Sequence, residues 1–294
     1  MKLVTFTPAG GKGSTRIGVL DGDAVVDLSV AAPDLPREMC AFLAAGADAL
    51  AAAGQAGSNS AARLALADVT LEAPILRPPK ILAVGLNYKD HIEETGMKTP
   101  EVPMIFNKQS TSVTGPGGVI HIPRASDKVD YEGELGVVIG RYCRHVPKKR
   151  AAEVIAGYTI AHDVSVRDWQ IRVPTFTMGK SFDTHCPIGP YIVTSDEVGD
   201  PHTLDLKTWV NGELRQNSNT CQLLFNCFEL IEHLSTAFTL EPGDIISTGT
   251  PSGVGFAMKP PNYLKPGDTV KIAIDKLGEL ENPVIAEPEN TVRM

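Results

Sequence analysis

Two glutamates, Glu132 and Glu134, lie in a stretch whose other residues predict a buried β-strand. Because successive side chains of a strand point to opposite faces, these carboxylates share one face, and Tyr131, Leu135 and Val137 share the other. Burial and mutual repulsion would push the pair towards its neutral form unless a positive charge compensates it. A hard divalent cation would supply that charge and prefers such oxygen ligands. The alternative is that one glutamate faces solvent while the other pairs with an arginine or a lysine.

Three further polar side chains could complete such a site. Asp163 follows a second strand-like run, at residues 155–162, and offers a third carboxylate, although aspartates also serve as turn or cap residues. Arg167 could clamp a substrate carboxylate with its forked guanidinium group. Lys180 lies among small and apolar residues, where its ammonium could stabilise developing negative charge, although most lysines lie at the surface.

His91 and Glu94 form a separate candidate pair in a predicted short helix that follows the strand at residues 81–85. Helical side chains three residues apart can meet, whereas Glu93 would point away. A carboxylate that orients a histidine makes it a better general base. A solvated helix face explains the same spacing equally well.

Predicted strands outnumber predicted helices and do not alternate regularly with them. This pattern favours a β-rich α+β fold, a roll or a barrel, over a doubly wound parallel sheet. The predicted strands of the larger part of the chain are residues 81–85, 117–121, 132–139, 155–162, 189–193, 206–210, 244–248 and 269–274, and helical patterns cover residues 149–154 and 223–238.

The first 75 residues predict a small α+β module that is separate from the larger domain at residues 80–294. Short strands at residues 3–6, 16–20 and 24–28, a plain connection at 8–14, an Asp21-Gly22 turn and a helical region at 36–53 make up this module. Prolines at positions 74, 78 and 79 predict an extended linker between the two parts.

Composition excludes several classes of partner. The formal net charge of -8 argues against nucleic acid and anionic membranes, since both favour basic surfaces. No run approaches the roughly 20 apolar residues of a membrane span. The first residues lack the apolar core of a signal peptide, so we expect a cytoplasmic protein. Five cysteines without CxxC spacing predict neither a disulfide framework nor a zinc thiolate site.

Taken together, the motifs resemble the fumarylacetoacetate hydrolase family, especially its small members of the FAH-domain-containing type. The resemblance covers residue 80 to about residue 277. It rests on six motifs in the family's order: Asn87-Tyr88-x-x-His91-x-x-Glu94, Tyr131-Glu132-Gly133-Glu134-Leu135, His162-Asp163-Val164-Ser165-x-Arg167-Asp168, Gly179-Lys180-x-Phe182-Asp183, Val210-Asn211-Gly212-Glu213 and Thr248-Gly249-Thr250-Pro251-x-Gly253-Val254-Gly255.

The resemblance implies a mixed β-roll around a metal ion, a homodimer and a small 2-oxo acid substrate. The ion is usually Mg²⁺ or Mn²⁺, with Ca²⁺ as a further occupant. By this similarity Glu132, Glu134 and Asp163 would hold the metal, Lys180 would lie beside it, Arg167, Gln170 and Thr250 would contact the substrate, and His91 and Glu94 would form a dyad on a lid. Leu86 departs from several acylpyruvate-cleaving relatives, which carry an arginine at that position.

The implied activity is metal-dependent hydrolysis of a carbon–carbon bond in a 2,4-dioxo acid of the acylpyruvate or fumarylpyruvate type. His91 would take a proton from the attacking water, and the metal and Lys180 would stabilise the departing pyruvate enolate. The same site could instead decarboxylate oxaloacetate, isomerise or hydrate muconate-like oxo acids, or act as a ureidoglycolate lyase. A non-catalytic metalloprotein that binds an oxo acid is the alternative outside enzymes.

Overall fold

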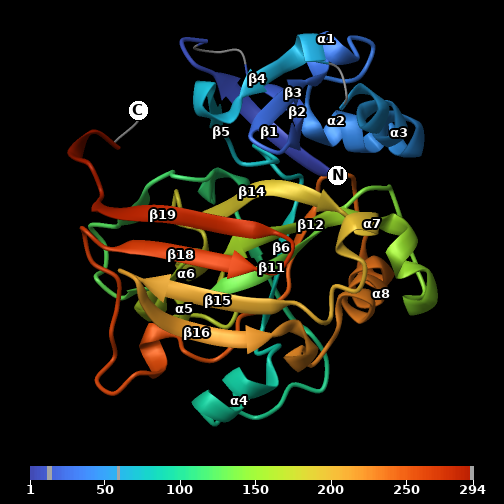
Figure 1. The fold of residues 1–294 in the computed structure, drawn as a ribbon. Helices are drawn as coiled ribbons and strands as arrows, with labels where there is room; N and C mark the ends of the chain where they lie inside the picture. The colour runs from blue at the N-terminus through green and yellow to red at the C-terminus, as the bar shows by residue number, and fades with distance from the viewer. Residues whose placement is uncertain (12–14, 58–59, 292–294) are drawn as a thin grey trace.

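The structure, a computed structural model, describes residues 1–11, 15–57 and 60–291. It contains a large mixed sheet, a smaller sheet and short helices around them (Figure 1). The predicted β-rich α+β class is therefore confirmed. In the described part of the chain the strands form open sheets and do not close into a barrel. The predicted connection at residues 8–14 falls partly outside the described residues.

The large sheet has 12 strands, and two adjacent inner strands lead to the candidate site. In spatial order they are β4 (Arg63–Ala65), β3 (Ala24–Asp27), β2 (Arg16–Asp21), β1 (Lys2–Pro8), β14 (Cys186–Thr194), β12 (Ile155–His162), β11 (Gly133–Ile139), β17 (Ile245–Ser247), β6 (Ile81–Gly85) and β7 (Met104–Lys108), with β5 (Val69–Leu71) paired to β1 and β8 (Val113–Thr114) paired to β14. Every residue of β11 and β12 is buried, which explains their nearly continuous apolar sequence.

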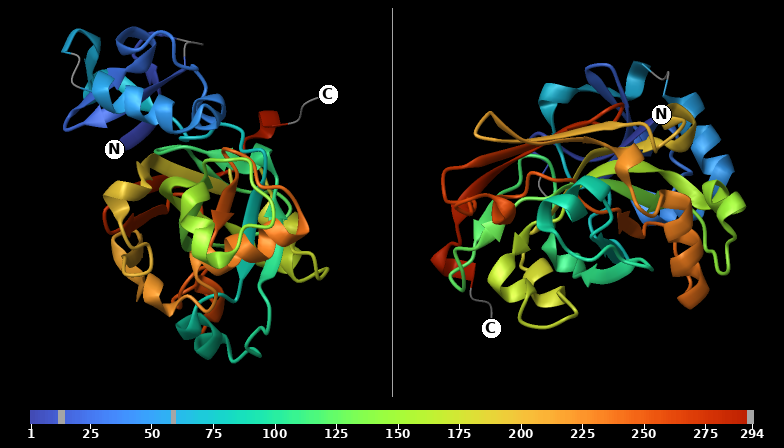
Figure 2. Two further views of the ribbon diagram at one scale, coloured as in Figure 1. Left: turned by 90° about the vertical axis from the view of Figure 1, so that its right-hand side faces the viewer. Right: turned by 90° about the horizontal axis from the view of Figure 1, so that it is seen from below.

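The N-terminal strands continue this sheet, because β1 pairs with β14 as well as with β2. Gly22 has a φ of +62° in the predicted turn between β2 and β3. The helices α1 (Leu28–Ala31), α2 (Met39–Ala44) and α3 (Gly46–Ala56) lie with these strands at one end of the molecule (Figures 1 and 2). The division into domains at residues 1–75 and 80–294 stays a prediction.

A second sheet of five strands packs near the start of β11. Its strands follow the order β16 (Glu213–Asn219), β15 (Asp205–Val210), β18 (Thr269–Ile274), β19 (Gly278–Ala286) and β9 (Ile120–Ile122). A Cβ at Gly133 would lie only 2.4 Å from the hydroxyl of Thr208 on β15. The N–H of Gly133 donates to the Gln216 side chain on β16 at 2.9 Å. The glycine between the two glutamates therefore allows the sheets to approach closely.

Short helices surround the sheets. They are α4 (Lys89–Thr95), α5 (Arg167–Gln170), α6 (Thr177–Lys180), α7 (Ser195–Val198) and α8 (Cys227–Ala237). Helix α8 begins four residues later than predicted because Asn226 caps it, together with Glu229 in a capping box. Helix α4 lies at the end of the molecule opposite the N-terminal strands (Figures 1 and 2). Among the described residues, no helix has the length and apolar character needed to cross a bilayer.

Candidate metal and active site

Glu132, Glu134 and Asp163 come together at the ends of β11 and β12. One oxygen from each carboxylate lies within 4.8 Å of the others, and none of the three residues is more than 4% exposed. In the antiparallel register Gly133 lies opposite His162. Glu132 and Asp163, the next residues outward, are therefore adjacent, and the Asp163 N–H donates to the Glu132 carbonyl at 3.0 Å.

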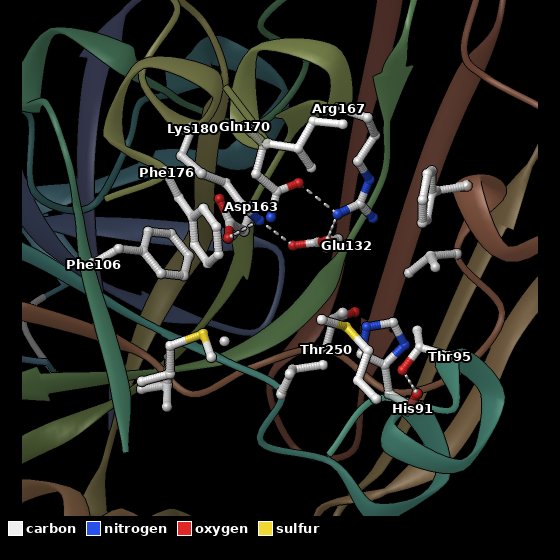
Figure 3. A pocket seen from close by; sticks show the side chains of 18 of the residues that line it. His91, Thr95, Phe106, Glu132, Asp163, Arg167, Gln170, Phe176, Lys180 and Thr250 are labelled. Atoms are coloured by element: carbon white, nitrogen blue, oxygen red, sulfur yellow. Dashed lines mark hydrogen bonds and ion pairs between the residues drawn. The ribbon is translucent and has the colours of Figure 1, made fainter. Parts of the chain in front are cut away.

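Lys180 provides a buried positive charge for two of these carboxylates (Figure 3). Its Nζ lies 2.5 Å from Glu132 Oε2 and 2.7 Å from Asp163 Oδ2. Burial alone would lower the pKa of Lys180, but the charges of Asp163 and Glu132 outweigh burial and raise it. The ammonium therefore stays charged beside the carboxylates.

Arg167 is engaged by protein carboxylates. Its Nη1 lies 2.6 Å from Glu132 Oε1, and its Nε donates to Asp130 Oδ2 at 2.8 Å. Asp130, to which sequence analysis gave no role, also accepts the backbone N–H groups of Gly255 and Phe256. The short strands β10 (Val129–Asp130) and β13 (Ser165–Val166) pair with each other and bring the two side chains together. The predicted contact of Arg167 with substrate stays a prediction.

Lys108 is a second buried lysine in the site, and it was not predicted from the sequence. It lies at the end of β7, and its Nζ donates to Asp163 Oδ1 at 2.6 Å and to the Val164 carbonyl at 3.2 Å. It also donates to the carbonyl of Lys180. The one available sequence signal was a lysine closing the otherwise strand-like run Met104-Ile105-Phe106-Asn107. Its partners lie 55 or more residues away and could not be inferred from local sequence.

The two glutamates have opposite protonation tendencies. Burial would raise the pKa of Glu132, but Arg167 and Lys180 outweigh it and lower that pKa to about 2. Burial, reinforced by the charges of Asp163 and Glu132, raises the pKa of Glu134 to about 8. Glu134 accepts hydrogen bonds from Ser247 Oγ at 2.5 Å and from the Gly249 N–H at 2.9 Å. Within the described residues it forms no ion pair.

This donor set fits a divalent metal ion. All three side chains offer carboxylate oxygens, which Mg²⁺, Mn²⁺ and Ca²⁺ prefer. The surrounding charges leave a negative excess once Glu134 ionises, because the lysine and arginine side chains pair with the other carboxylates. A dication bound by Glu132, Glu134 and Asp163 would remove the repulsion that opposes ionisation of Glu134.

His91 and Glu94 form the predicted pair on α4. His91 Nδ1 lies 3.0 Å from Glu94 Oε2, and the other carboxylate oxygen of Glu94 accepts the Gly253 N–H at 2.8 Å. Gly96 ends the helix with a left-handed φ of +65°. In Figure 3 the carboxylates of Glu132 and Asp163 lie between Lys180 and His91. The pair therefore belongs to the same site as the acidic cluster.

All predicted site residues except Glu94 line one cavity of about 440 Å³, and Glu94 lies behind His91. Thr250 Oγ1 donates to the Gly133 carbonyl at 3.1 Å and accepts from Gln216 Nε2 at 2.7 Å. Gln170 accepts from Arg167 at 3.0 Å. The cavity combines a charged floor with mostly apolar walls, as small-molecule sites commonly do.

The chain belongs to the fumarylacetoacetate hydrolase family. Residues 80–285 match the family model described as Fumarylacetoacetate (FAA) hydrolase C-terminal. Solved structures support this membership over nearly the whole chain. A fumarylacetoacetate hydrolase from Exiguobacterium antarcticum is 36% identical with a TM-score of 0.84, and the match covers 98% of this chain and 100% of that one.

Two further relatives are named for individual reactions. A Xenopus laevis protein named as a mitochondrial oxaloacetate tautomerase is 44% identical over 97% of this chain and 90% of its own length. A maleylpyruvate hydrolase from Sphingobium sp. SYK-6, solved with manganese(II) and pyruvate, is 34% identical with a TM-score of 0.80, over 98% of this chain and 100% of that one. The chain therefore belongs to a family of enzymes, and its acidic cluster is a candidate metal site.

The relatives correct one expectation. The Xenopus protein and its rat and human counterparts are all named as mitochondrial, which contradicts the cytoplasmic location expected from the sequence. That expectation rested on the absence of a membrane-span-like run and of an apolar leader in the sequence. Neither property distinguishes the cytoplasm from another aqueous compartment.

Proposed function

We propose that the protein is a metal-dependent tautomerase that interconverts the enol and keto forms of oxaloacetate. The observation that carries the proposal is a single cavity that holds a buried cluster of three carboxylates together with the His91–Glu94 pair. The relatives named as oxaloacetate tautomerases, 43–45% identical to this chain, direct the choice of substrate.

Glu132, Glu134 and Asp163 would hold Mg²⁺ or Mn²⁺. When bound, such an ion supplies Lewis-acid polarisation to the 2-oxo group and the adjacent carboxylate of the substrate. Lys180 places a buried ammonium beside the same carboxylates, where it would stabilise negative charge developing on the 2-oxo oxygen. Lys108 and Arg167 pair with Asp163 and Glu132 and hold these carboxylates in place.

His91 would take the hydroxyl proton of the enol and deliver a proton to carbon 3, and would run the same transfer in reverse from the keto form. Because Glu94 accepts from Nδ1, the opposite nitrogen, Nε2, can receive or deliver this proton. Glu94 is itself held by the Gly253 N–H, so the orientation of the imidazole ring is supported from two sides. The apolar walls would limit the access of bulk water to the reacting carbon.

Hydrolysis of a carbon–carbon bond is the second candidate function. The His91–Glu94 pair favours it, since a histidine oriented by a carboxylate can take a proton from an attacking water. The maleylpyruvate hydrolase named above adds support. Decarboxylation of oxaloacetate would develop the same charge beside Lys180 but would need no attacking water.

A comparison of products separates these reactions. Purified protein would be given enol oxaloacetate, keto oxaloacetate and acetylpyruvate, each with Mn²⁺ and after treatment with EDTA. The proposal predicts accelerated loss of the enol absorbance, no release of pyruvate beyond that caused by Mn²⁺ alone, and loss of activity with EDTA. Cleavage of acetylpyruvate to pyruvate and acetate would favour hydrolysis. Carbon dioxide released from oxaloacetate faster than by Mn²⁺ alone would favour decarboxylation. No metal-dependent change in any compound would contradict the proposed function.

A further inference from the structure

Four basic side chains line the cavity, and three of them already have close partners. Lys180 pairs with Glu132 and Asp163. Arg167 pairs with Glu132 and with a further buried aspartate, and His91 pairs with the carboxylate of its own helix. The fourth is Arg172. A dicarboxylic substrate needs a cation for the carboxylate that lies far from the metal-binding end.

Arg172 is positioned for such a contact, and its guanidinium has no close carboxylate partner among the described residues. Its single ion pair in the described structure, with Asp168, is 3.8 Å long, and its side chain is 53% exposed. Its guanidinium lies 4.0 Å from the centroid of the Trp169 ring, which packs edge-on against Phe182 at 5.2 Å. The stacking restricts the guanidinium and leaves its N–H donors available to a ligand.

Beyond the metal-binding end, the other residues of the cavity wall carry no charge that could bind a substrate carboxylate in place of Arg172. Leu86 lies on the wall as an apolar side chain, and Phe106 and Phe176 pack together at 6.0 Å on the side of Lys180 (Figure 3). Most of the remaining lining residues are apolar as well. An anionic group beyond the metal-binding end would therefore be drawn to Arg172.

We propose that Arg172 binds the far carboxylate of the substrate and makes the enzyme selective for dicarboxylic 2-oxo acids. This inference rests on the proposed function, because it assigns the two ends of the same substrate. The carboxylate next to the 2-oxo group would lie at the metal-binding end of the cavity. The second carboxylate would bind the Arg172 guanidinium. Loss of a hydrogen bond to a charged group typically weakens binding about tenfold or more.

The test compares oxaloacetate with its 4-methyl ester, which keeps the reactive end and removes the far charge. Arg172→Met should raise KM for oxaloacetate about tenfold and leave KM for the ester within about twofold. Arg172→Lys should fall between wild type and Arg172→Met. Arg141→Met is the matched control, since Arg141 is exposed and does not line the cavity.

Two results would overturn the assignment: an unchanged KM for oxaloacetate in Arg172→Met, or an equal rise for both compounds. Failure of the proposed function looks different, because the wild-type protein would then turn over neither compound. In that case calorimetric titration of both compounds into the Mn²⁺-loaded protein still decides the role of Arg172. Weaker binding of oxaloacetate alone in Arg172→Met would support it, and equal binding by wild type and variant would refute it.

Discussion

Lys108 Nζ lies 2.6 Å from Asp163 Oδ1, while Lys180 binds the other oxygen of the same carboxylate at 2.7 Å. Each carboxylate oxygen of Asp163 therefore contacts the ammonium group of a different lysine. If Lys180 turns towards a substrate, Lys108 still holds the Asp163 carboxylate in place. Lys108 also donates to the Lys180 carbonyl, so it positions the backbone from which the Lys180 side chain extends.

Replacement of Lys108 tests this support. Lys108→Met should lower the affinity for Mn²⁺ about tenfold or more and reduce the free energy of unfolding by about 3 kcal/mol, because Asp163 loses a buried partner. Lys108→Arg keeps the charge and should recover part of both losses. Calorimetric titration with Mn²⁺ and urea unfolding measure the two quantities. Wild-type metal affinity in Lys108→Met would show that Lys108 does not support the metal site.

The two glutamates should respond differently to the same substitution. Glu134→Gln should abolish Mn²⁺ binding yet change the stability of the metal-free protein by less than about 1 kcal/mol, since glutamine can accept the same hydrogen bonds from Ser247 and Gly249. Glu132→Gln should cost about 3 kcal/mol, because it removes one of the two carboxylates that Arg167 and Lys180 each contact. Urea unfolding of both variants checks the contrast. Equal losses of stability would refute it.

The raised pKa of Glu134 predicts how stability and metal binding depend on pH. Between pH 4.5 and about 8 the folded metal-free protein keeps a proton that the unfolded chain has released. Its free energy of unfolding should therefore fall as the pH rises through this interval. Mn²⁺ affinity should rise over the same interval, because the ion binds the deprotonated carboxylate.

Glu134→Gln is the control for this pH dependence, because it has no proton to release. Unfolding would be followed in urea at several pH values with EDTA present, and Mn²⁺ binding would be followed by calorimetry in buffers of different ionisation enthalpy. Wild type should lose more stability than the variant between pH 5 and 8. Parallel pH profiles for the two proteins would remove Glu134 from this role.

His91 should be needed for proton transfer but not for metal binding. His91→Gln should lower kcat for oxaloacetate tautomerisation by about 10²-fold or more while leaving the Mn²⁺ affinity within about twofold. Glu94→Gln should have a smaller effect, since the imidazole remains but its orientation is less well fixed. Enol absorbance and calorimetry provide the two readouts. A fully active His91→Gln protein would exclude histidine as the proton carrier.

The sequence predicted the site best where local periodicity determines geometry. The period of two predicted that Glu132 and Glu134 point the same way, and both line the cavity although Glu132 lies one residue before β11. Helical spacing paired His91 with Glu94. The position of Asp163 depended on the register of β11 with β12, which no local pattern determines. The sequence offered Asp163 as a candidate ligand, and the family resemblance favoured that role over a turn or cap.

Lys108 and Asp130 were missed because their importance comes entirely from tertiary contacts. Each contacts groups that are distant in the sequence, at Asp163 and at Gly255 respectively. The pairing of β1 with β14, which joins the N-terminal strands to the main sheet, could not be predicted from local sequence for the same reason. The expected homodimer stays a prediction that sedimentation analysis can check.

The metal site is tested most directly by locating manganese in crystals grown with Mn²⁺, by anomalous diffraction at the manganese absorption edge. We expect one strong peak bounded by the carboxylates of Glu132, Glu134 and Asp163, and no such peak in crystals of Glu134→Gln. A peak elsewhere, or none at saturating Mn²⁺, would show that these three carboxylates do not form the metal site.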